Sequence, residues 1–429
     1  MVLLAIGCMV SNTYFASAEN WPSWRGPLGT GAAKGVRPPI RWSETENIVW
    51  KVPIPGRGSS TPIVWEDRIY VTTAIPTFVN SASPDRRGAI RSSGVVKYDV
   101  IALDRLTGDV EWRRTATREK PHEGTHKEGT WASHSPIVDG TRLFVFFGSR
   151  GLFCYDLKGE LLWTTDFGDQ RIRNGFGEGS SPSLYGDHIV VNWDHEGDSF
   201  VVALDKYSGI ERWRRERDER TSWSTPLIAD TGGKQQVIIS ATNLSRAYDL
   251  ETGADLWESA GMTANVIPSP VYTNGLVYLV SGFRGAALQA VDVTNAAGDI
   301  TGTDAIVWSY HQDTPYVSSA LIYDGKIYFL KSNRGILTCL DARTGEEIYT
   351  RQRLEGISSI YSSPVSGNGM IYLTGRDGTT LVIDGGRKFT VVGKNRIDER
   401  VDASIALVDD QMFIRGSHSL YCISELLNK

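Results

Sequence analysis

An eleven-residue phrase recurs four times in this chain and constrains its fold more than any other feature. The copies read ALDRLTGDVEW, ALDKYSGIERW, AYDLETGADLW and CLDARTGEEIY, and they end at Trp112, Trp213, Trp257 and Tyr349. A version shorter by one residue, CYDLKGELLW, ends at Trp163. Self-similarity of this kind is typical of repeat architectures, in which each copy forms one supersecondary unit.

Each phrase predicts a β-hairpin. The apolar residues before the aspartate alternate as they do in a strand. Asp104, Asp205, Asp249 and Asp341 then open a turn in which Thr or Ser and Gly follow, residues that tight turns favour. The second strand ends in the large aromatic residue. Because an isolated hairpin is marginally stable at best, these hairpins must pack against neighbouring units.

A second pattern precedes each hairpin. It consists of small residues, a short strand, a turn of Gly, Asp or Asn, and another alternating strand, as in SSPSLYGDHIVVNW. The eight versions begin at Pro62, Pro136, Pro182, Pro226, Pro270, Ala320, Pro364 and Ile405. After a first interval of 74 residues, these starts lie 41–50 residues apart, close to the period of roughly 40–50 residues in propeller blades. The sequence therefore predicts an all-β, eight-bladed β-propeller of four-stranded antiparallel blades.

The two ends of the repeat array predict how the ring closes. The last unit runs out near Tyr421, which leaves no room for an outer strand, whereas NIVWKVPI, ending at Ile54, carries Trp50 in the aromatic position of the hairpin. We expect this N-terminal strand to complete the last blade, which removes a free sheet edge. The predicted propeller domain covers residues 19–429, with an N-terminal segment and closing strand at 19–55 and the blades at 56–429.

The first eighteen residues follow a different pattern. MVLLAIGCMV is apolar, and Ala16 and Ala18 are small residues before Glu19, which predicts a signal peptide at 1–18. A positively charged start is missing. Cys8, after LAIG, loosely fits a lipid-anchor site as an alternative. Both interpretations predict export, to the periplasm or the cell surface.

Charge and cysteine content narrow the function classes. The net charge is −5 and the charges are scattered, so no basic footprint indicates a nucleic-acid partner. Cys154, Cys339 and Cys422 fall at apolar strand positions of different units. We interpret them as buried thiols rather than metal ligands, since no spacing suits a metal. The sequence predicts a monomer with no transmembrane span.

The strand and hairpin unit with its DxxTGxxxW turn resembles the pyrroloquinoline quinone (PQQ) repeat. That repeat builds the quinoprotein alcohol dehydrogenases and the BamB-type scaffold of outer-membrane assembly. WPSWRGPLGTG, WSETENIVWKVPIPGRG, VNWDHEGDSFVVALD and TSWSTPLI are similar to a bacterial family of secreted PQQ-like propellers. The resemblance implies the fold of nearly the whole mature chain. It does not decide the activity, because one fold hosts many functions.

The resemblance to quinoprotein dehydrogenases implies features that this chain does not match. Those enzymes have a vicinal Cys–Cys disulfide over the quinone, a Ca²⁺ site with acidic and Asn ligands, an Asp base and often a C-x-x-C-H haem segment. No equivalent set can be placed here residue by residue. We therefore predict no cofactor and no catalytic residues, with bound PQQ or Ca²⁺ as the less favoured alternative.

Chain direction predicts which face of the ring binds a ligand. The loops that enter the first strand of each blade and those that join strands two and three emerge on one face, opposite the DxxTG turns. Two insertions, IPTFVNSASPDRRGAIRSSG and TREKPHEGTHKEGT, also fall there, and long loops on a rigid scaffold usually carry function. Tyr361 lies in such a loop. The candidate ligand-face residues are Arg57, Trp131, Arg150, Glu178, Trp193, Asp194, His195, Glu196, Trp223, Arg284, Tyr316, Arg334 and Arg376.

Three groups among these loops have competing interpretations. Asp194, Glu196 and Asp198 are weak candidates for a divalent cation, against solvated turn residues. His122 and His126 would form a metal pair only on a helix, and otherwise belong to a surface loop. Four arginines could together hold an anion or each pair with a local acid: Arg150, Arg284, Arg334 and Arg376.

The favoured function is a non-catalytic binding or scaffold module that takes an envelope protein or a glycan on the loop-rich face. The alternative is a quinone- or metal-dependent oxidoreductase. A further alternative is a carbohydrate-binding module in which Trp131, Trp193 and Trp223 are stacking platforms.

Overall fold

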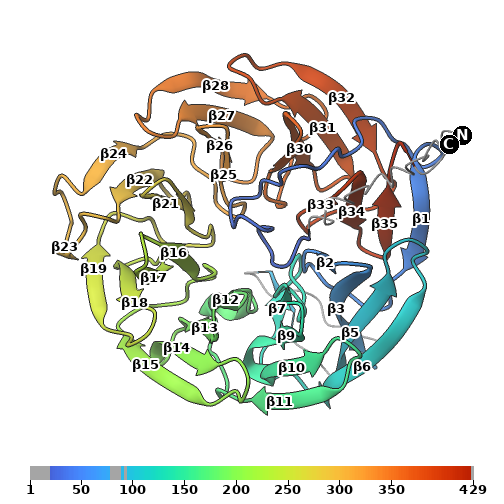
Figure 1. Cartoon of the computed structure of the whole chain (residues 1–429), viewed down its shortest axis with the longest axis horizontal. Helices are drawn as coiled ribbons and strands as arrows, with labels where there is room; N and C mark the ends of the chain where they lie inside the picture. Colours follow the sequence, from blue (N-terminus) through green and yellow to red (C-terminus); the bar gives the residue numbers. More distant parts are fainter. Residues whose placement is uncertain (1–19, 78–87, 91–93, 427–429) are drawn as a thin grey trace, which may run out of the picture.

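The computed structural model describes residues 20–77, 88–90 and 94–426, and within them eight antiparallel sheets stand around one axis (Figure 1). This arrangement confirms the eight-bladed propeller. The predicted signal peptide and Cys8 lie outside the described residues. Within the described part of the chain, no helix is long and apolar enough to cross a membrane.

The strands of each blade follow one another from the axis outward. Blades 1 to 4 consist of β2 (Ile63–Trp65), β3 (Arg68–Pro76), β5 (Val96–Asp104) and β6 (Val110–Glu119); β8 (Ile137–Val138), β9 (Arg142–Phe146), β10 (Leu152–Asp156) and β11 (Leu161–Thr165); β12 (Ser183–Tyr185), β13 (His188–Trp193), β14 (Ser199–Asp205) and β15 (Glu211–Arg217); and β16 (Leu227–Asp230), β17 (Gln235–Ile239), β18 (Ser245–Asp249) and β19 (Asp255–Ser259).

Blades 5 to 8 repeat the order. They consist of β20 (Val271–Thr273), β21 (Leu276–Ser281), β22 (Ala287–Asp292) and β24 (Ile306–Tyr310); β25 (Leu321–Tyr323), β26 (Lys326–Leu330), β27 (Ile336–Asp341) and β28 (Glu347–Arg353); β29 (Val365–Gly367), β30 (Met370–Thr374), β31 (Thr379–Asp384) and β32 (Val391–Arg396); and β33 (Ala406–Val408), β34 (Gln411–Arg415), β35 (Ser419–Ile423) and β1 (Ile48–Pro53). A short strand from the blade 5 insertion, β23 (Gly298–Asp299), pairs with the outer edge of blade 4.

The N-terminal strand closes the ring, as the sequence predicted. β1 pairs antiparallel with β35, and Trp50 lies opposite Cys422. The last blade is therefore built from both ends of the described chain, and β1 covers the outer edge of β35.

Five tryptophans in the hairpin-terminal position join their blade to the next one, whereas Trp257 donates to Gln236 of its own blade. The indole of Trp213 donates a hydrogen bond to the Leu250 carbonyl of blade 4 at 2.7 Å, and its ring packs on Gly253. A Cβ atom at Gly253 would lie 2.6 Å from that ring, and the glycine has a φ of +68°, so both space and backbone conformation require glycine. The equivalent indole donors and carbonyls are Trp50–Arg105, Trp112–Leu157, Trp163–Lys206 and Trp308–Ala342.

Truncating one of these rings tests this contact between blades. We expect Trp213→Ala to lower the free energy of unfolding by about 3 kcal/mol, because it leaves a cavity between two sheets. Ile210→Ala, in the same hairpin but 68% exposed, should stay within about 0.5 kcal/mol of wild type. Denaturant titration measures both, and equal effects of the two substitutions would contradict the packing role.

A belt of hydroxyl groups surrounds the axis at the start of the innermost strands. The backbone N–H of Thr61 donates to Ser135 Oγ, and the same bond recurs from blade to blade at 2.9–3.0 Å. The remaining acceptors are Ser181, Thr225, Ser269, Ser319, Ser363 and Ser404. Thr61 Oγ1 has no hydrogen-bond partner among the described residues, so the belt is open where blade 8 meets blade 1.

The N-terminal segment before β1 crosses the centre of the ring (Figure 1). Trp21 pairs with Val64 of blade 1. Arg25 donates to the carbonyls of Ala320 and Pro364, in blades 6 and 7, at 2.9 and 3.1 Å. The segment thereby fills much of the axial channel, and Trp24 within it faces the cavity described next.

Candidate functional site: an axial cavity in the loop-rich face

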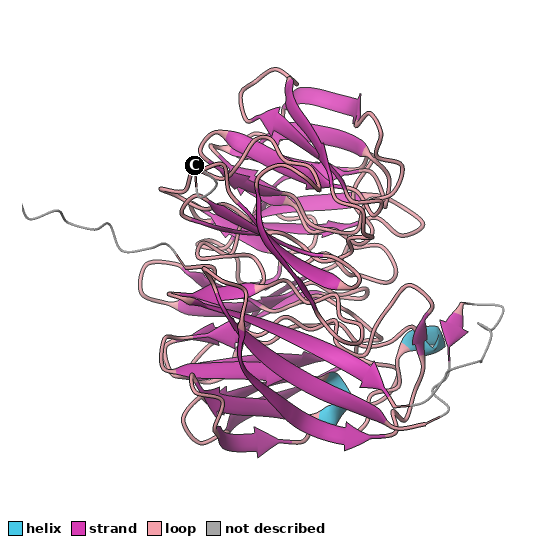
Figure 2. Ribbon diagram, turned by 90° about the vertical axis from the view of Figure 1, so that its right-hand side faces the viewer, coloured by secondary structure: helices cyan, strands magenta, loops and turns pink. Residues whose placement is uncertain are grey.

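The two long insertions meet on one face of the propeller. Ala89–Ile90 (β4) from the first insertion pairs with Thr125–His126 (β7) from the second. The short 3₁₀ helix Arg173–Gly175 (η2) lies against β4. Figure 2 shows these elements projecting on one side of the ring. Part of the first insertion, residues 78–87 and 91–93, lies outside the described residues.

A cavity of about 510 Å³ opens at the axis on this face. The loops that enter the first strands supply most of its lining, which includes five of the belt residues. Such a volume is within the range of roughly 300–1,000 Å³ for small-molecule sites. Its aromatic residues are Trp24, Phe176, Trp223, Phe283, Tyr316 and Tyr361.

The contacts of these rings fix their orientation. Trp223 donates its indole N–H to the Gly177 carbonyl at 2.7 Å. Phe283 and Tyr316 stack with their centroids 4.7 Å apart. Rings held in this way present flat apolar faces to a ligand at little entropic cost.

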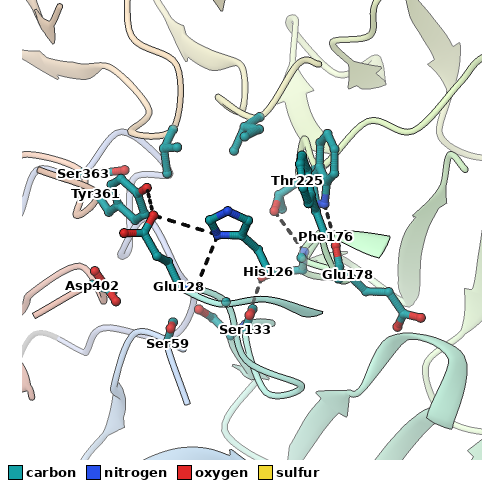
Figure 3. Close-up of a pocket in the computed structure, with 18 of the residues that line it drawn as sticks. Ser59, His126, Glu128, Ser133, Phe176, Glu178, Thr225, Tyr361, Ser363 and Asp402 are labelled. Carbon is teal, nitrogen blue, oxygen red and sulfur yellow. Dashed lines mark hydrogen bonds and ion pairs between the residues drawn. The ribbon is translucent and has the colours of Figure 1, made fainter. Parts of the chain in front are cut away.

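Glu128 lies at the tip of a loop that reaches across the face, which we call the strap (residues 120–130). Its carboxylate accepts hydrogen bonds from the Tyr361 hydroxyl at 2.6 Å and from Arg376 Nη1 at 2.8 Å, both in blade 7 connections. Its carbonyl accepts a hydrogen bond from Arg400 at 3.3 Å. Figure 3 shows Glu128 between Tyr361 and His126. The strap thus links the connection between blades 1 and 2 to blades 7 and 8.

The charges around Glu128 balance one another. Asp402 accepts hydrogen bonds from Arg376 Nε at 2.7 Å and from Arg400 Nε at 2.8 Å, so two carboxylates face two guanidinium groups. Although burial acts to raise it, the hydrogen bonds from Tyr361 and Arg376 lower the pKa of Glu128 to about 2. Burial lowers the pKa of His126, partly opposed by Glu128. At neutral pH Glu128 is therefore ionised, while His126 is neutral.

Glu178 borders the cavity but points its carboxyl group away from it (Figure 3). The carboxyl accepts hydrogen bonds from the Ser149 N–H at 2.8 Å and from Ser149 Oγ at 2.5 Å. Burial raises the pKa of Glu178. The folded protein therefore favours the protonated form of this group more than the unfolded chain does.

This raised pKa predicts a pH dependence of stability. A carboxyl group with a raised pKa in the folded state stabilises below its unfolded pKa, and that contribution is lost as the pH rises. We expect Glu178→Gln to raise the melting temperature relative to wild type at pH 8, with a smaller difference at pH 4, because the amide is uncharged at both values. Calorimetry from pH 4 to 8 measures this, with the exposed Glu346→Gln as control. A pH-independent difference would contradict it.

The structure brings several of the candidate residues together at the cavity. Glu178, Trp223, Tyr316 and Tyr361 line it. Arg376 does not line it but holds Glu128 and Asp402. Arg57 is exposed, and its pKa is lowered by desolvation and by the nearby charge of Arg400.

Three other candidates from blade 3, Trp193, Asp194 and His195, are buried, whereas Glu196 is exposed. Trp193 is only 1% exposed and stacks on Phe200. Both oxygens of Asp194 accept hydrogen bonds from Arg217, and neither side chain of this pair is exposed. The side chains of the adjacent residues form hydrogen bonds with nearby groups of the chain. His195 bonds to the Arg171 N–H and the Asp198 carbonyl, and Glu196 bonds to Thr221. No three metal-ligating side chains gather anywhere in the described ranges.

The remaining candidates are spread along the rim. Trp131 is partly buried and donates its indole N–H to the Glu123 carbonyl at 3.3 Å. Arg150 forms ion pairs with Glu119 and Asp169, and Arg284 and Arg334 are exposed. The four arginines therefore do not converge on one ligand, and Arg150 and Arg376 each pair with acids nearby. His122 bonds to Arg150 and His126 lines the cavity.

Sequence reasoning did not single out five of the charged and aromatic residues of the cavity. No repeated pattern marks Glu128 or Asp402, and Phe176 and Phe283 lie in loops without one. Trp24 comes from the N-terminal segment, whose path the repeats do not indicate. The available signal was positional: aromatic residues stand in the loops before the first strands of blades 3, 4, 6 and 7, at Phe176, Trp223, Tyr316 and Tyr361.

Comparisons with known proteins agree with this architecture. A family model described as outer membrane protein assembly factor BamB matches residues 96–260 and 197–425. The tetrathionate hydrolase of Acidithiobacillus ferrooxidans is 21% identical over 360 residues, which cover 77% of this chain and 66% of that protein. The curated relatives are matched over between 22% and 66% of their own length.

Two solved structures share the fold. The structure of BamB from Moraxella catarrhalis superposes with a TM-score of 0.53 at 14% identity, over 82% of this chain and 98% of that one. The quinohemoprotein alcohol dehydrogenase from Comamonas testosteroni gives a TM-score of 0.62 at 10% identity, over 95% of this chain and 80% of that one. At such identities the likeness concerns the fold alone.

The residues at the axis do not fit a quinone cofactor of the PQQ type. PQQ carries three carboxyl groups, but the charged side chains that line the described cavity are Glu128, Glu178 and Asp402. The three described cysteines are buried in β10, β27 and β35, far apart in sequence, so they cannot supply a vicinal disulfide.

Proposed function

This chain belongs to the family of PQQ-like propellers described as outer membrane protein assembly factor BamB, and from that membership we propose that it is an exported, non-catalytic binding module. Its ligand or partner binds on the loop-rich face, centred on the axial cavity. The partner is an envelope protein or a glycan. The family description supports a role in assembly at the outer membrane, since relatives bear that name.

One observation supports this proposal above the others: the strap and the aromatic loops together form the lining of a cavity on one face. Glu128 ties the strap to Tyr361, Arg376 and Arg400. Strap residues thus form part of the cavity wall. The hydrogen bonds that hold these groups orient them for binding.

The second candidate is an oxidoreductase, favoured by the likeness to a quinohemoprotein alcohol dehydrogenase over 95% of this chain. Addition of PQQ and Ca²⁺ to the purified protein separates the two candidates. Tight quinone binding with dye-linked alcohol oxidation would replace the binding-module proposal.

Site-specific photo-crosslinking in the envelope tests the proposed face. A photoreactive residue at the exposed Arg284 or Arg334 positions should trap a partner. The same group at Leu106 or Ile210, exposed by 54% and 68% in the DxxTG turns of the opposite face, should trap none. Crosslinks confined to Leu106 and Ile210 would contradict the proposal.

A further inference from the structure

The axial cavity combines aromatic faces with hydroxyl groups and carboxylates whose charges are already matched. Besides its six aromatic rings, its lining contains hydroxyl groups from Ser59, Ser133, Ser135, Ser181, Thr225, Ser363 and Ser404. These features differ from those of a site for a charged ligand.

An anionic ligand meets the wrong charges in this cavity. Neither Lys nor Arg lines the described cavity, whereas Glu128 and Asp402 do. Arg376 and Arg400 are engaged by those two carboxylates. A carboxylate or phosphate placed among these acids would lose its hydration without gaining a partner, which is costly.

The position that a cationic ligand would occupy is already occupied by a cationic side chain of the protein. The guanidinium of Arg376 lies 3.8 Å over the Tyr361 ring and pairs with both Glu128 and Asp402. It therefore already makes the cation–π contact and the ion pairs that an ammonium group would require. An added cation would have to displace it.

An uncharged ligand rich in hydroxyl groups fits what remains. Each ionised carboxyl group offers about four acceptor sites, and the arginines and Tyr361 occupy only part of them. Glu128 and Asp402 are thus rigid acceptors for ligand hydroxyl groups. His126, neutral at pH 7, adds a donor or acceptor on its ring.

The aromatic rings complete the match with a ring-shaped ligand. Trp223, fixed by its bond to Gly177, and the stacked pair of Phe283 and Tyr316 offer flat faces for the C–H groups of a saturated ring. We infer that the axial cavity binds a neutral sugar residue, stacked on Trp223 and hydrogen-bonded to Glu128 and Asp402. This inference rests on the proposed function and names the class of its ligand.

Three sugars of the same ring size but different charge test the inference directly. Binding of N-acetylglucosamine, glucosamine and glucuronic acid to the full chain is followed by tryptophan fluorescence and calorimetry, alongside a glycan array that includes neutral oligosaccharides. We expect neutral glycans to bind, and the charged form of a bound sugar to bind more weakly by about tenfold or more, a difference of about 1.4 kcal/mol. No binding by any neutral glycan, or tighter binding of the uronic acid or of PQQ, would overturn the inference.

Variants identify the binding place. Trp223→Ala should abolish glycan binding and Trp223→Phe should retain part of it, since the ring face is kept. Glu128→Gln should weaken binding by about tenfold. Tyr207→Ala, at an exposed ring of a DxxTG turn, is the control and should bind as wild type does. Unchanged binding by both Trp223→Ala and Glu128→Gln would overturn the inference, and circular dichroism shows whether each variant is folded.

The two proposals fail in different ways. If no glycan binds but crosslinks form at Arg284 or Arg334, the sugar inference is wrong and the binding-face proposal stands. If crosslinks form only at Leu106 or Ile210, the binding face is wrong whatever the array shows.

Discussion

A chain that lacks residues 48–53 is expected to lose its cooperative thermal transition. These residues form β1, which supplies the outer edge of blade 8 and the indole of Trp50 that bonds to Arg105 of blade 1 at 3.1 Å. Losing that ring alone costs about 3–5 kcal/mol, and each lost ladder hydrogen bond adds about 1 kcal/mol. The sum approaches the whole stability of a typical domain, roughly 5–15 kcal/mol.

Differential scanning calorimetry and far-ultraviolet circular dichroism measure the effect of this deletion. A synthetic peptide of residues 41–55 should restore the transition by adding the missing strand to the exposed edge of β35. The same peptide with Trp50→Ala should restore it poorly. If the truncated chain melts as wild type does, the ring is not closed by β1.

The second large effect concerns the buried ion pair of blade 3. Arg217 donates to both oxygens of Asp194 at 2.7 and 3.1 Å and also to the Tyr248 hydroxyl, with no exposure of either charged side chain. We expect Arg217→Met to lower the free energy of unfolding by about 3–5 kcal/mol, because Asp194 is left as an uncompensated buried charge.

A double substitution separates the charge from the packing. Asp194→Leu together with Arg217→Met removes both charges and should cost less than Arg217→Met alone. The surface pair Glu211–Arg214, in the same strand β15 as Arg217, is the matched control, and Arg214→Met should cost less than about 1 kcal/mol. Urea titration measures the free energy of unfolding of the three variants. A double variant less stable than Arg217→Met alone would contradict the assignment.

The repeats determined much of the fold because each copy carries its own physical constraints. At five blade junctions, the tryptophan at the end of one hairpin and the glycine of the next turn form one contact between blades, as Trp213 and Gly253 show. Trp50 occupies the same position outside the repeats. That identity is why closure by the N-terminal strand could be predicted.

The site was harder to predict because it is made by segments far apart in the chain. Glu128 and Arg376 are separated by 248 residues. They meet only because the blades close into a ring and the strap reaches across its face. Trp193 illustrates a different limit. We expected it in a loop, but β13 extends through it, and alternate residues of a strand face opposite sides, so its ring points into the core. A shift of one residue in the end of a strand decides whether such a side chain lies in the core or in a loop.

If the ligand binds at the axial cavity, the indole groups of the tryptophans there report its binding directly. Trp24 and Trp223 line the cavity, whereas Trp112, Trp163, Trp213, Trp257 and Trp308 lie in the hairpins. In nitrogen-15 correlation spectra of the protein titrated with neutral oligosaccharides, we expect the indole signals of Trp24 and Trp223 to shift and those of the hairpins to stay. Shifts confined to the hairpin indoles would contradict ligand binding at the axial cavity.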